Sequence, residues 1–267
     1  MAEIAATPSS ERKTRTAGVI WGLPKVGKTT LLTSLPGNKL FCMLDPDGDQ
    51  SIPDRDDIHI MRLYEYSDAD CMAFLENKMP TFIKNNAGKY DSYIFDSMST
   101  LYRMALNDAI RKDVGGGKNF SPSLDTPGLA AYGSRTNHIL NIINKNLRAT
   151  SSVGAHCWFT SHEDEPKTND KGEFLYITMN MSGKAINGLG LEVSEIWYMR
   201  QHDGKWYICI KPMRGKQPMG SRMFDVTTLG EFQLKFKPEL GCDQDHSIAT
   251  WYQRWLESGK QKLPLPK

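Results

Sequence analysis

The sequence predicts an α/β fold in which a mainly parallel sheet is flanked by helices and a late antiparallel hairpin is added. Three observations support this class. Short apolar runs alternate with amphipathic stretches up to about residue 160, which is the pattern of a parallel sheet covered by helices. A glycine-containing stretch, residues 22–30, stands between the first apolar run and the first helical pattern. Later, the dipeptide Asp203-Gly204 separates two apolar runs and suits a tight hairpin turn.

The elements of the parallel part follow in order along the chain. Strands are expected at the apolar runs 18–21, 39–44, 58–63, 92–95 and 155–160. Helical patterns lie between them at residues 31–35, 68–85, 99–113 and 129–150. Three glycines at 115–117 stop the third helix, and in the fourth Ile139, Ile142, Ile143 and Leu147 recur at helical spacing.

The last third of the chain has a different texture. Residues 195–212 predict two strands around the Asp203-Gly204 turn, so the sheet gains antiparallel strands late. Residues 246–259 form a modest helical pattern with Ile248, Trp251, Trp255 and Leu256 on roughly one face.

The chain length and composition allow one substantial core. With 267 residues, 39% hydrophobic and 24% charged, the chain is compatible with one large domain or with one domain and an appendage. We expect a flexible N-terminal arm at residues 1–16, a core at 17–225, and a C-terminal helical appendage and tail at 226–267.

The charge and the cysteines exclude several classes of protein. The formal net charge of +2 gives no bulk attraction to nucleic acid or membrane, so any nucleic-acid contact must come from a local patch. The five cysteines are scattered and never spaced C-x-x-C, which argues against a disulfide framework or a zinc site. No apolar run approaches the roughly 20 residues of a membrane helix, and no signal-peptide pattern opens the chain, so we expect a cytoplasmic protein without membrane contact.

Residues 22–29 match the phosphate-loop pattern G-x-x-x-x-G-K-S/T, in the strand-to-helix context that gives it meaning. Backbone N–H groups of such a loop and of the following helix start surround phosphate oxygens, Lys28 supplies a positive charge, and the Thr29 hydroxyl is the expected Mg²⁺ ligand. The alternative is a chance glycine turn. The expected nucleotide-binding residues are Gly22, Leu23, Pro24, Lys25, Val26, Gly27, Lys28, Thr29 and Thr30.

A phosphate loop needs an acidic partner for the metal at the end of a neighbouring strand. The apolar residues Tyr93, Ile94 and Phe95 lead directly into Asp96, which is therefore the second expected metal ligand. The alternative role for Asp96 is that of a helix N-cap.

Four segments together resemble the RecA-type ATPase core, and more closely the compact phage-encoded RecA-core proteins regarded as single-strand annealing or recombination ATPases. They are "GLPKVGKTT", "LDPDGD", "YIFDS", and "HCWFTSHEDE" followed by a hairpin and "KPMRGKQPMGSR". The resemblance covers roughly residues 17–225 and implies a RecA-type P-loop NTPase fold with ATP and Mg²⁺ as ligands.

The resemblance also implies two further catalytic residues. An acidic residue after the second strand, usually Glu, orients the attacking water in this family, and the match puts Asp47 there with Asp45 as its neighbour. Because Asp is about one methylene shorter, slow hydrolysis is expected; the alternative is that this segment is only an acidic turn. His162 resembles the polar sensor of the γ-phosphate, with a capping or surface histidine as the alternative.

Basic residues after the hairpin are candidates for a contact between subunits. The resemblance implies that Lys211, Arg214 or Lys216 could reach a neighbouring subunit's phosphate site as a finger in trans. The alternatives are a solvated basic turn and contacts with DNA phosphates.

Two segments are expected to be mobile loops that engage single-stranded DNA, residues 114–128 and 164–190. Lys118, Phe120 and Lys184 combine positive charge with an aromatic ring or a flexible backbone, as strand binding requires. Loops are enriched in such residues for other reasons, so this pattern is weakly specific.

The leading hypothesis is a magnesium-dependent, RecA-like ATPase that forms a homo-oligomer, ring or filament, and binds single-stranded DNA to promote annealing or strand exchange in the cytoplasm of a phage's bacterial host. A phage or host single-strand binding protein is a candidate partner. The alternatives are a nucleotide-gated DNA-binding protein with little turnover and a motor or helicase-loading ATPase. A small-molecule kinase is less attractive because no arginine-rich lid segment follows the phosphate loop.

Overall fold

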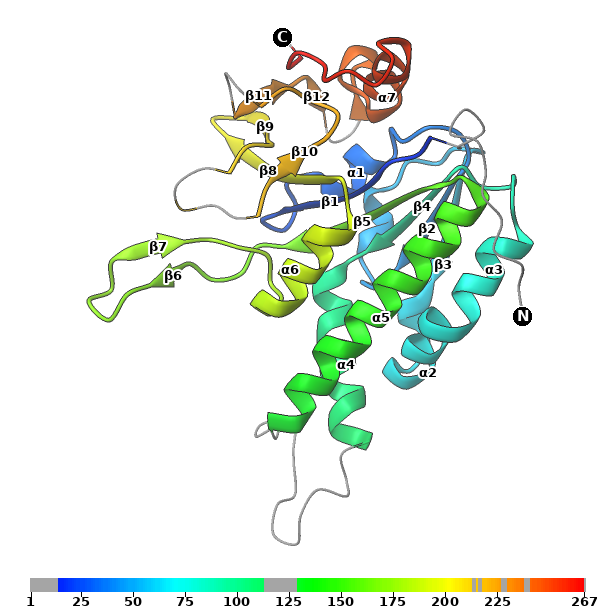
Figure 1. The fold of residues 1–267 in the computed structure, drawn as a ribbon, viewed down its shortest axis with the longest axis vertical. Helices are drawn as coiled ribbons and strands as arrows, with labels where there is room; N and C mark the ends of the chain where they lie inside the picture. Colours follow the sequence, from blue (N-terminus) through cyan, green and yellow to red (C-terminus); the bar gives the residue numbers. More distant parts are fainter. Residues whose placement is uncertain are drawn as a thin grey trace, which may run out of the picture.

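A computed structural model describes residues 14–112, 129–212, 215, 218–226, 230–237 and 241–266. Among these residues a nine-stranded sheet has the order β11-β9-β8-β1-β5-β4-β2-β3, with β10 paired to β8 (Figure 1). Its strands are β1 (Ala17–Gly22), β2 (Lys39–Met43), β3 (Ile58–Arg62), β4 (Ser92–Asp96), β5 (His156–His162), β8 (Glu195–His202), β9 (Lys205–Cys209), β10 (Gly220–Ser221) and β11 (Glu231–Leu234).

The predicted fold class is confirmed by the directions of the strands. Strands β3, β2, β4, β5, β1 and β8 are parallel to one another, whereas β9 and β10 pair antiparallel with β8 and β11 pairs antiparallel with β9. Strands β8 and β9 form the late hairpin around Asp203 and Gly204, whose φ angles of 49° and 69° are those of a tight primed turn. The expected parallel sheet with an antiparallel addition is therefore the observed one.

Helices cover both faces of the sheet. They are α1 (Lys28–Leu32), α2 (Asp68–Ala73), α3 (Met79–Asn85), α4 (Met98–Lys112), α5 (Leu129–Val153), α6 (Gly183–Glu192) and α7 (Ile248–Glu257). Short helical turns occupy η2 (Gly48–Ser51), η3 (Leu63–Glu65), η4 (Phe74–Lys78) and η5 (Gln244–His246). In β1, Val19 and Trp21 pack in the core with helices α2 to α6, whereas Ile20 packs on the other side with α1 and α7. This alternation makes two apolar layers around one sheet.

The segment after residue 225 is not a separate appendage. Strand β11 pairs with β9 at one edge of the sheet, although it was expected to lie outside the core. Trp251 of α7 is buried, and its ring lies 5.4 to 5.8 Å from the rings of Phe224, Phe232 and Trp197. Because Trp251 packs on these buried rings, the C-terminal helix is part of the core.

Residues 14–16, which were expected to belong to a flexible N-terminal arm, pack against the rest of the protein. Residues 1–13 lie outside the described part of the chain. The Thr16 N–H donates to Nδ1 of the buried His156, at 3.1 Å, and the Tyr252 hydroxyl donates to the Thr14 carbonyl, at 2.7 Å. These contacts join residues 14–16 to β5 and α7.

The second expected loop, residues 164–190, contains regular structure. Strands β6 (Lys167–Thr168) and β7 (Phe174–Tyr176) form a two-stranded hairpin that projects from the body of the protein, and α6 follows it (Figure 1). The first expected loop, residues 114–128, lies outside the described residues. No helix within the described ranges is long and apolar enough to cross a membrane.

Candidate functional site

The turn between β1 and α1 has a backbone that only glycine fits at two positions. Gly27 caps α1 in the left-handed region, with φ of 91°, and an added Cβ would lie 2.6 Å from the Phe236 ring. Gly22 has φ of 153°, and an added Cβ would lie 2.1 Å from the Met199 carbonyl oxygen. The loop is therefore held close to β8 and β12 (Phe236–Lys237), and its backbone can form an anion nest at the start of the helix.

Lys28 places a buried positive charge under this turn. Its Nζ atom donates to the carbonyl oxygens of Gly22 and Leu23, at 3.0 and 2.7 Å. Burial lowers the pKa of Lys28 to about 8, and the negative charges of Asp96, Glu163 and Asp45 partly offset that effect. Lys28 therefore still carries its proton at neutral pH, and its compact charge suits phosphate oxygens.

Thr29 and Asp96 meet as the sequence predicted. The Thr29 hydroxyl donates to Oδ2 of Asp96 at 2.5 Å, and the Thr160 hydroxyl of β5 donates to Oδ1. Burial raises the pKa of Asp96, whereas the hydrogen bonds from Thr160 and Thr29 and the charge of Lys28 oppose that rise. Strand β5 lies between β1, which leads into the phosphate loop, and β4, which ends at Asp96. Thr160 of β5 therefore reaches Asp96 from the neighbouring strand.

The donor set fits magnesium held together with a phosphate. Hydroxyl and carboxylate oxygens are the ligands that Mg²⁺ prefers, and it is usually bound by only one or two protein groups with the remaining positions taken by phosphate and water. The described residues contain no group of three or more His, Cys, Asp or Glu side chains that could hold a metal by themselves. Thr29 and Asp96 would therefore hold the ion only in company with a phosphate group.

Asp45, rather than Asp47, faces this site. Asp45 follows β2 and accepts hydrogen bonds from the hydroxyls of Ser97, at 2.8 Å, and of Thr100. The side chain of Asp47 is exposed, and within the described residues it makes no hydrogen bond or ion pair with the site. This geometry does not support the expected role of Asp47, because the chain turns into η2 after Asp45. The signal that identifies Asp45 is its place just after the strand, which resembles that of Asp96.

His162 lies at the end of β5, where it was expected. It is the register partner of Gly22, and its backbone N–H donates to the Ser99 hydroxyl at 2.8 Å. Burial and then the charge of Lys28 lower the pKa of His162, so the ring is neutral and its 4.0 Å approach to Asp45 is not a strong ion pair. The ring atom Nδ1 is buried with no hydrogen-bond partner in the described structure. A neutral imidazole beside the phosphate loop can hydrogen-bond a phosphate oxygen.

Sequence reasoning missed several polar residues that support the site. Glu163 donates its N–H to the Gly22 carbonyl at 3.0 Å and accepts from the Tyr198 hydroxyl at 2.9 Å. Thr160, Ser97 and Thr100 supply the hydroxyls already described. Glu163 and Ser97 directly follow strands, Thr160 lies within β5 and Thr100 lies in the first turn of α4. Nothing in their spacing distinguishes them from ordinary polar residues.

The remaining predicted residues make no hydrogen bond or ion pair with Asp96 or Asp45 in the described structure, or lie in the phosphate loop itself, or fall outside the described residues. Lys184 is exposed on α6, and Thr30 is buried, with its hydroxyl 3.4 Å from the Ser51 carbonyl. Lys211 follows β9, where its N–H approaches the Gly230 carbonyl at 3.3 Å. Lys118, Phe120, Arg214 and Lys216 lie outside the described residues. Of the other loop residues, Val26 is buried, whereas Leu23, Pro24 and Lys25 are exposed.

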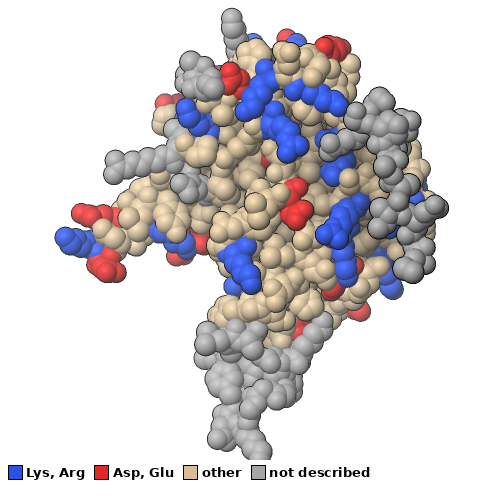
Figure 2. Space-filling model, in the orientation of Figure 1, with Lys and Arg blue, Asp and Glu red and all other residues tan. Residues whose placement is uncertain are grey.

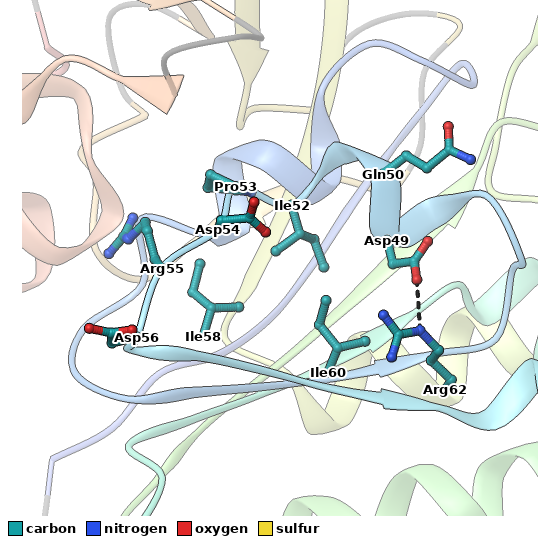
Figure 3. Close-up of a pocket in the computed structure, with 10 residues that line it drawn as sticks. All are labelled: Asp49, Gln50, Ile52, Pro53, Asp54, Arg55, Asp56, Ile58, Ile60 and Arg62. Carbon is teal, nitrogen blue, oxygen red and sulfur yellow. Dashed lines mark hydrogen bonds and ion pairs between the residues drawn. The ribbon is translucent and has the colours of Figure 1, made fainter.

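A separate groove of about 730 Å³ runs along the edge strand β3 (Figure 3). Ile52, Ile58 and Ile60 form its apolar floor, and an ion pair of 3.0 Å between Asp49 and Arg62 closes one end. The groove contains none of the predicted site residues. Its charges are of both signs, so it does not indicate a particular ionic ligand.

A family described as an AAA domain matches residues 14–226, which is more than half of the 267-residue chain. The matched range contains the phosphate loop, Asp45, Asp96 and His162. A search of curated proteins found no match.

Proposed function

Since the chain belongs to the AAA domain family of P-loop ATPases, we propose that it is a magnesium-dependent, RecA-type ATPase that acts on single-stranded DNA in phage recombination or annealing. The observation that supports the ATPase part best is that Lys28 and the hydrogen-bonded pair Thr29–Asp96 lie together at the loop between Gly22 and Gly27. This combination is what a nucleoside triphosphate with its metal requires.

Each residue of the site has its own role in binding or hydrolysing ATP. Backbone N–H groups around Gly27 and the charge of Lys28 bind the β- and γ-phosphates. Thr29 and Asp96 would hold Mg²⁺, which when bound neutralises the charge that builds up on the transferred phosphoryl group. Asp45 takes the water-orienting role, held in position by Ser97 and Thr100.

The structure suggests how the γ-phosphate could be sensed. His162 lies beside the loop, and β5 continues from it through Glu163 toward the β6–β7 hairpin. A hydrogen bond from His162 to the γ-phosphate would bias the position of this segment, and its loss on hydrolysis would release it.

The DNA and oligomer parts of the proposal are supported by the resemblance to phage-encoded RecA-core proteins and by the exposed Lys184. In the same proposal the protein acts as a homo-oligomer in the bacterial cytoplasm. A basic residue among Lys211, Arg214 and Lys216 reaches the phosphate site of a neighbouring subunit. A phage or host single-strand binding protein is a further partner. A finger of this kind would make turnover depend on assembly.

Phosphate release by wild type and Lys28→Ala, with and without single-stranded DNA, tests the proposal. We expect DNA to stimulate the wild type and Lys28→Ala to lose nearly all turnover, while Lys84→Ala, which removes an exposed lysine of α3, behaves as wild type. Absence of heat on mixing folded protein with ATP and Mg²⁺ in a calorimeter would rule the scheme out.

A second candidate is a nucleotide-gated DNA-binding protein with little turnover. It is favoured by the exposure of Asp47 and by the two hydroxyls already bound to the shorter carboxylate of Asp45, which limit its reach toward a water. Tight ATP binding without phosphate release, even at saturating DNA, would select this candidate.

A further inference from the structure

The guanidinium of Arg135, on α5, lies over the rings of two tyrosines. Its guanidinium carbon lies 3.8 Å from the Tyr102 ring centroid and 4.9 Å from that of Tyr132. Its Nε atom is buried and makes no hydrogen bond, and among the described residues no carboxylate pairs with it. Burial lowers the pKa of Arg135 and the two tyrosines oppose that effect, but a guanidinium stays charged at any physiological pH. The charge is therefore fixed in place and uncompensated.

The position of this arginine is set by three helices. Tyr102 of α4 is buried, and its hydroxyl oxygen accepts a 2.9 Å hydrogen bond from the N–H of Ser182. The hydroxyl of Thr136, next to Arg135, lies 3.3 Å from the Ser182 hydroxyl. Ser182 is followed immediately by α6, which lies beside α5 (Figure 1). Arg135 therefore lies where α4, α5 and the beginning of α6 meet.

Two further side chains on the helices of this junction, Lys184 of α6 and Tyr132 of α5, are open to solvent. Lys184, two residues past Ser182, is exposed, and within the described part of the chain it has no ion pair. Tyr132 is 40% exposed, so part of its ring is free although it also contacts Arg135. The junction thus combines two positive charges with one accessible aromatic ring.

We propose that Arg135, Lys184 and Tyr132 form a binding site for the sugar-phosphate backbone and one base of single-stranded nucleic acid. The inference rests on the DNA-binding part of the proposed function and deepens it. The contacts with the Tyr102 and Tyr132 rings hold the Arg135 guanidinium in place, so its terminal N–H groups donate to a phosphate in a fixed geometry. Lys184 binds the adjacent phosphate, and the Tyr132 ring stacks on a base.

The β6–β7 hairpin fits nucleic acid less well, although it was part of the expected DNA loop. Its Phe174, Leu175 and Tyr176 are exposed, which alone would suit base stacking. However, residues 163–176 contain five acidic and only two basic side chains, which would repel phosphates. Figure 2 shows acidic and basic side chains mixed at the tip of the hairpin. Of the expected DNA-binding segment, the part that fits is the beginning of α6.

Fluorescence anisotropy of a labelled oligothymidylate, measured over a range of salt concentrations, tests the site. We expect Arg135→Ala to weaken binding at least about tenfold and to make the salt slope shallower by about 0.7, the value for one phosphate contact on a single strand. Tyr132→Ala should weaken binding by at least about fivefold, because it removes the ring that stacks on a base and one of the two rings that hold Arg135. Its salt slope should stay closer to the wild-type value than that of Arg135→Ala, because the positive charge remains. Arg148→Ala, which removes an exposed arginine from the same helix, should bind as wild type.

Several results would overturn the inference. One is an Arg135→Ala protein that keeps wild-type affinity and slope. Another is displacement of the oligonucleotide by inorganic phosphate when chloride at the same ionic strength does not displace it, which would indicate a site for a free anion. If circular dichroism shows that Arg135→Ala is unfolded, Arg135→Lys is measured in its place. This variant keeps the positive charge but loses the planar guanidinium, so we expect the salt slope to persist while the affinity for the oligonucleotide falls. An unchanged affinity refutes the site.

Failure of the inference and failure of the proposed function are distinguishable. A wild-type protein that binds ATP in the calorimeter but not the oligonucleotide loses this site and the DNA part of the function, while the ATPase part stands. If the oligonucleotide binds but Arg135 and Tyr132 variants are unaffected, only this site is refuted.

Discussion

The hydroxyl of Thr29 donates a hydrogen bond of 2.5 Å to Oδ2 of Asp96, although 67 positions separate the two residues. Thr29 lies in the first turn of α1, which follows β1, and Asp96 lies at the end of β4. Strand β5 lies between β1 and β4 in the sheet. The contact brings together the two oxygen ligands that a phosphate-bound magnesium ion would need. It also identifies the place in the fold where the chemistry is concentrated.

The Thr29–Asp96 pair should determine the magnesium requirement. We expect Thr29→Val, which removes the hydroxyl but keeps the side-chain shape, to raise the Mg²⁺ concentration for half-maximal phosphate release at least about tenfold. Thr29→Ser keeps the hydroxyl and should stay close to wild type. Equal magnesium dependence in all three proteins, measured by titration with the metal, would contradict the assignment.

Asp45 and Asp47 form a matched pair of variants. We expect Asp45→Asn to lower kcat about 100-fold or more, because it removes the carboxylate that faces the site. Asp47→Asn changes an exposed side chain and should stay within about twofold of wild type. Steady-state phosphate release measures both, and the reverse order would restore the sequence-based assignment of Asp47.

The lowered pKa of Lys28, about 8, makes ATP affinity dependent on pH. The phosphates need the charged amine, so above pH 8 binding must first add a proton to the free protein. The apparent affinity should therefore fall by about tenfold per pH unit there, and be nearly constant below pH 7. Calorimetry in buffers of different ionisation enthalpy should detect proton uptake above pH 8 and little at pH 6.5. A Lys28→Arg protein that binds ATP should lack this dependence, since arginine stays charged.

The close approach of Gly22 to β8 should make it intolerant of any side chain. Gly22→Ala would place a Cβ against the Met199 carbonyl oxygen, which is backbone and cannot rotate away, so we expect a loss of unfolding free energy of about 2 kcal/mol or more. Gly220→Ala meets nothing within 4 Å and should change stability little. Urea denaturation monitored by tryptophan fluorescence compares the two. Equal stability would mean that the loop has a different backbone.

Trp251 should be a core residue of the whole protein rather than of an appendage. Trp251→Ala removes a buried ring that contacts Trp197 and Phe224, so we expect a loss of about 3 to 5 kcal/mol of unfolding free energy in a single cooperative transition. Gln253→Ala, at an exposed position of α7, is the matched control. A two-step unfolding curve in which Trp251→Ala shifts only one step would support an independent C-terminal unit.

Much of the fold could be read from local patterns in the sequence. The parallel strands are continuous apolar runs, and Asp203-Gly204 between two apolar runs is a strong signal for a two-residue hairpin turn, so β1 to β5 and the β8–β9 hairpin lie where they were expected. The segment 164–190 was misread because β6 and β7 are short and α6 contains three glycines, Gly183, Gly188 and Gly190, which are typical of loops.

The candidate site divides in the same way. The sequence alone determined the phosphate-loop pattern and the carboxylate expected to bind the metal, because Gly27, Lys28, Thr29 and Asp96 follow from spacing and from a position at a strand end. Only the tertiary structure decided that Asp45 faces the site and Asp47 does not, that Thr160 donates to Asp96, and that the Arg135 guanidinium lies over two tyrosine rings. The physical reason is that a local pattern specifies the conformation of its own few residues, whereas contacts between distant side chains depend on strand order and helix packing, which the whole core decides together.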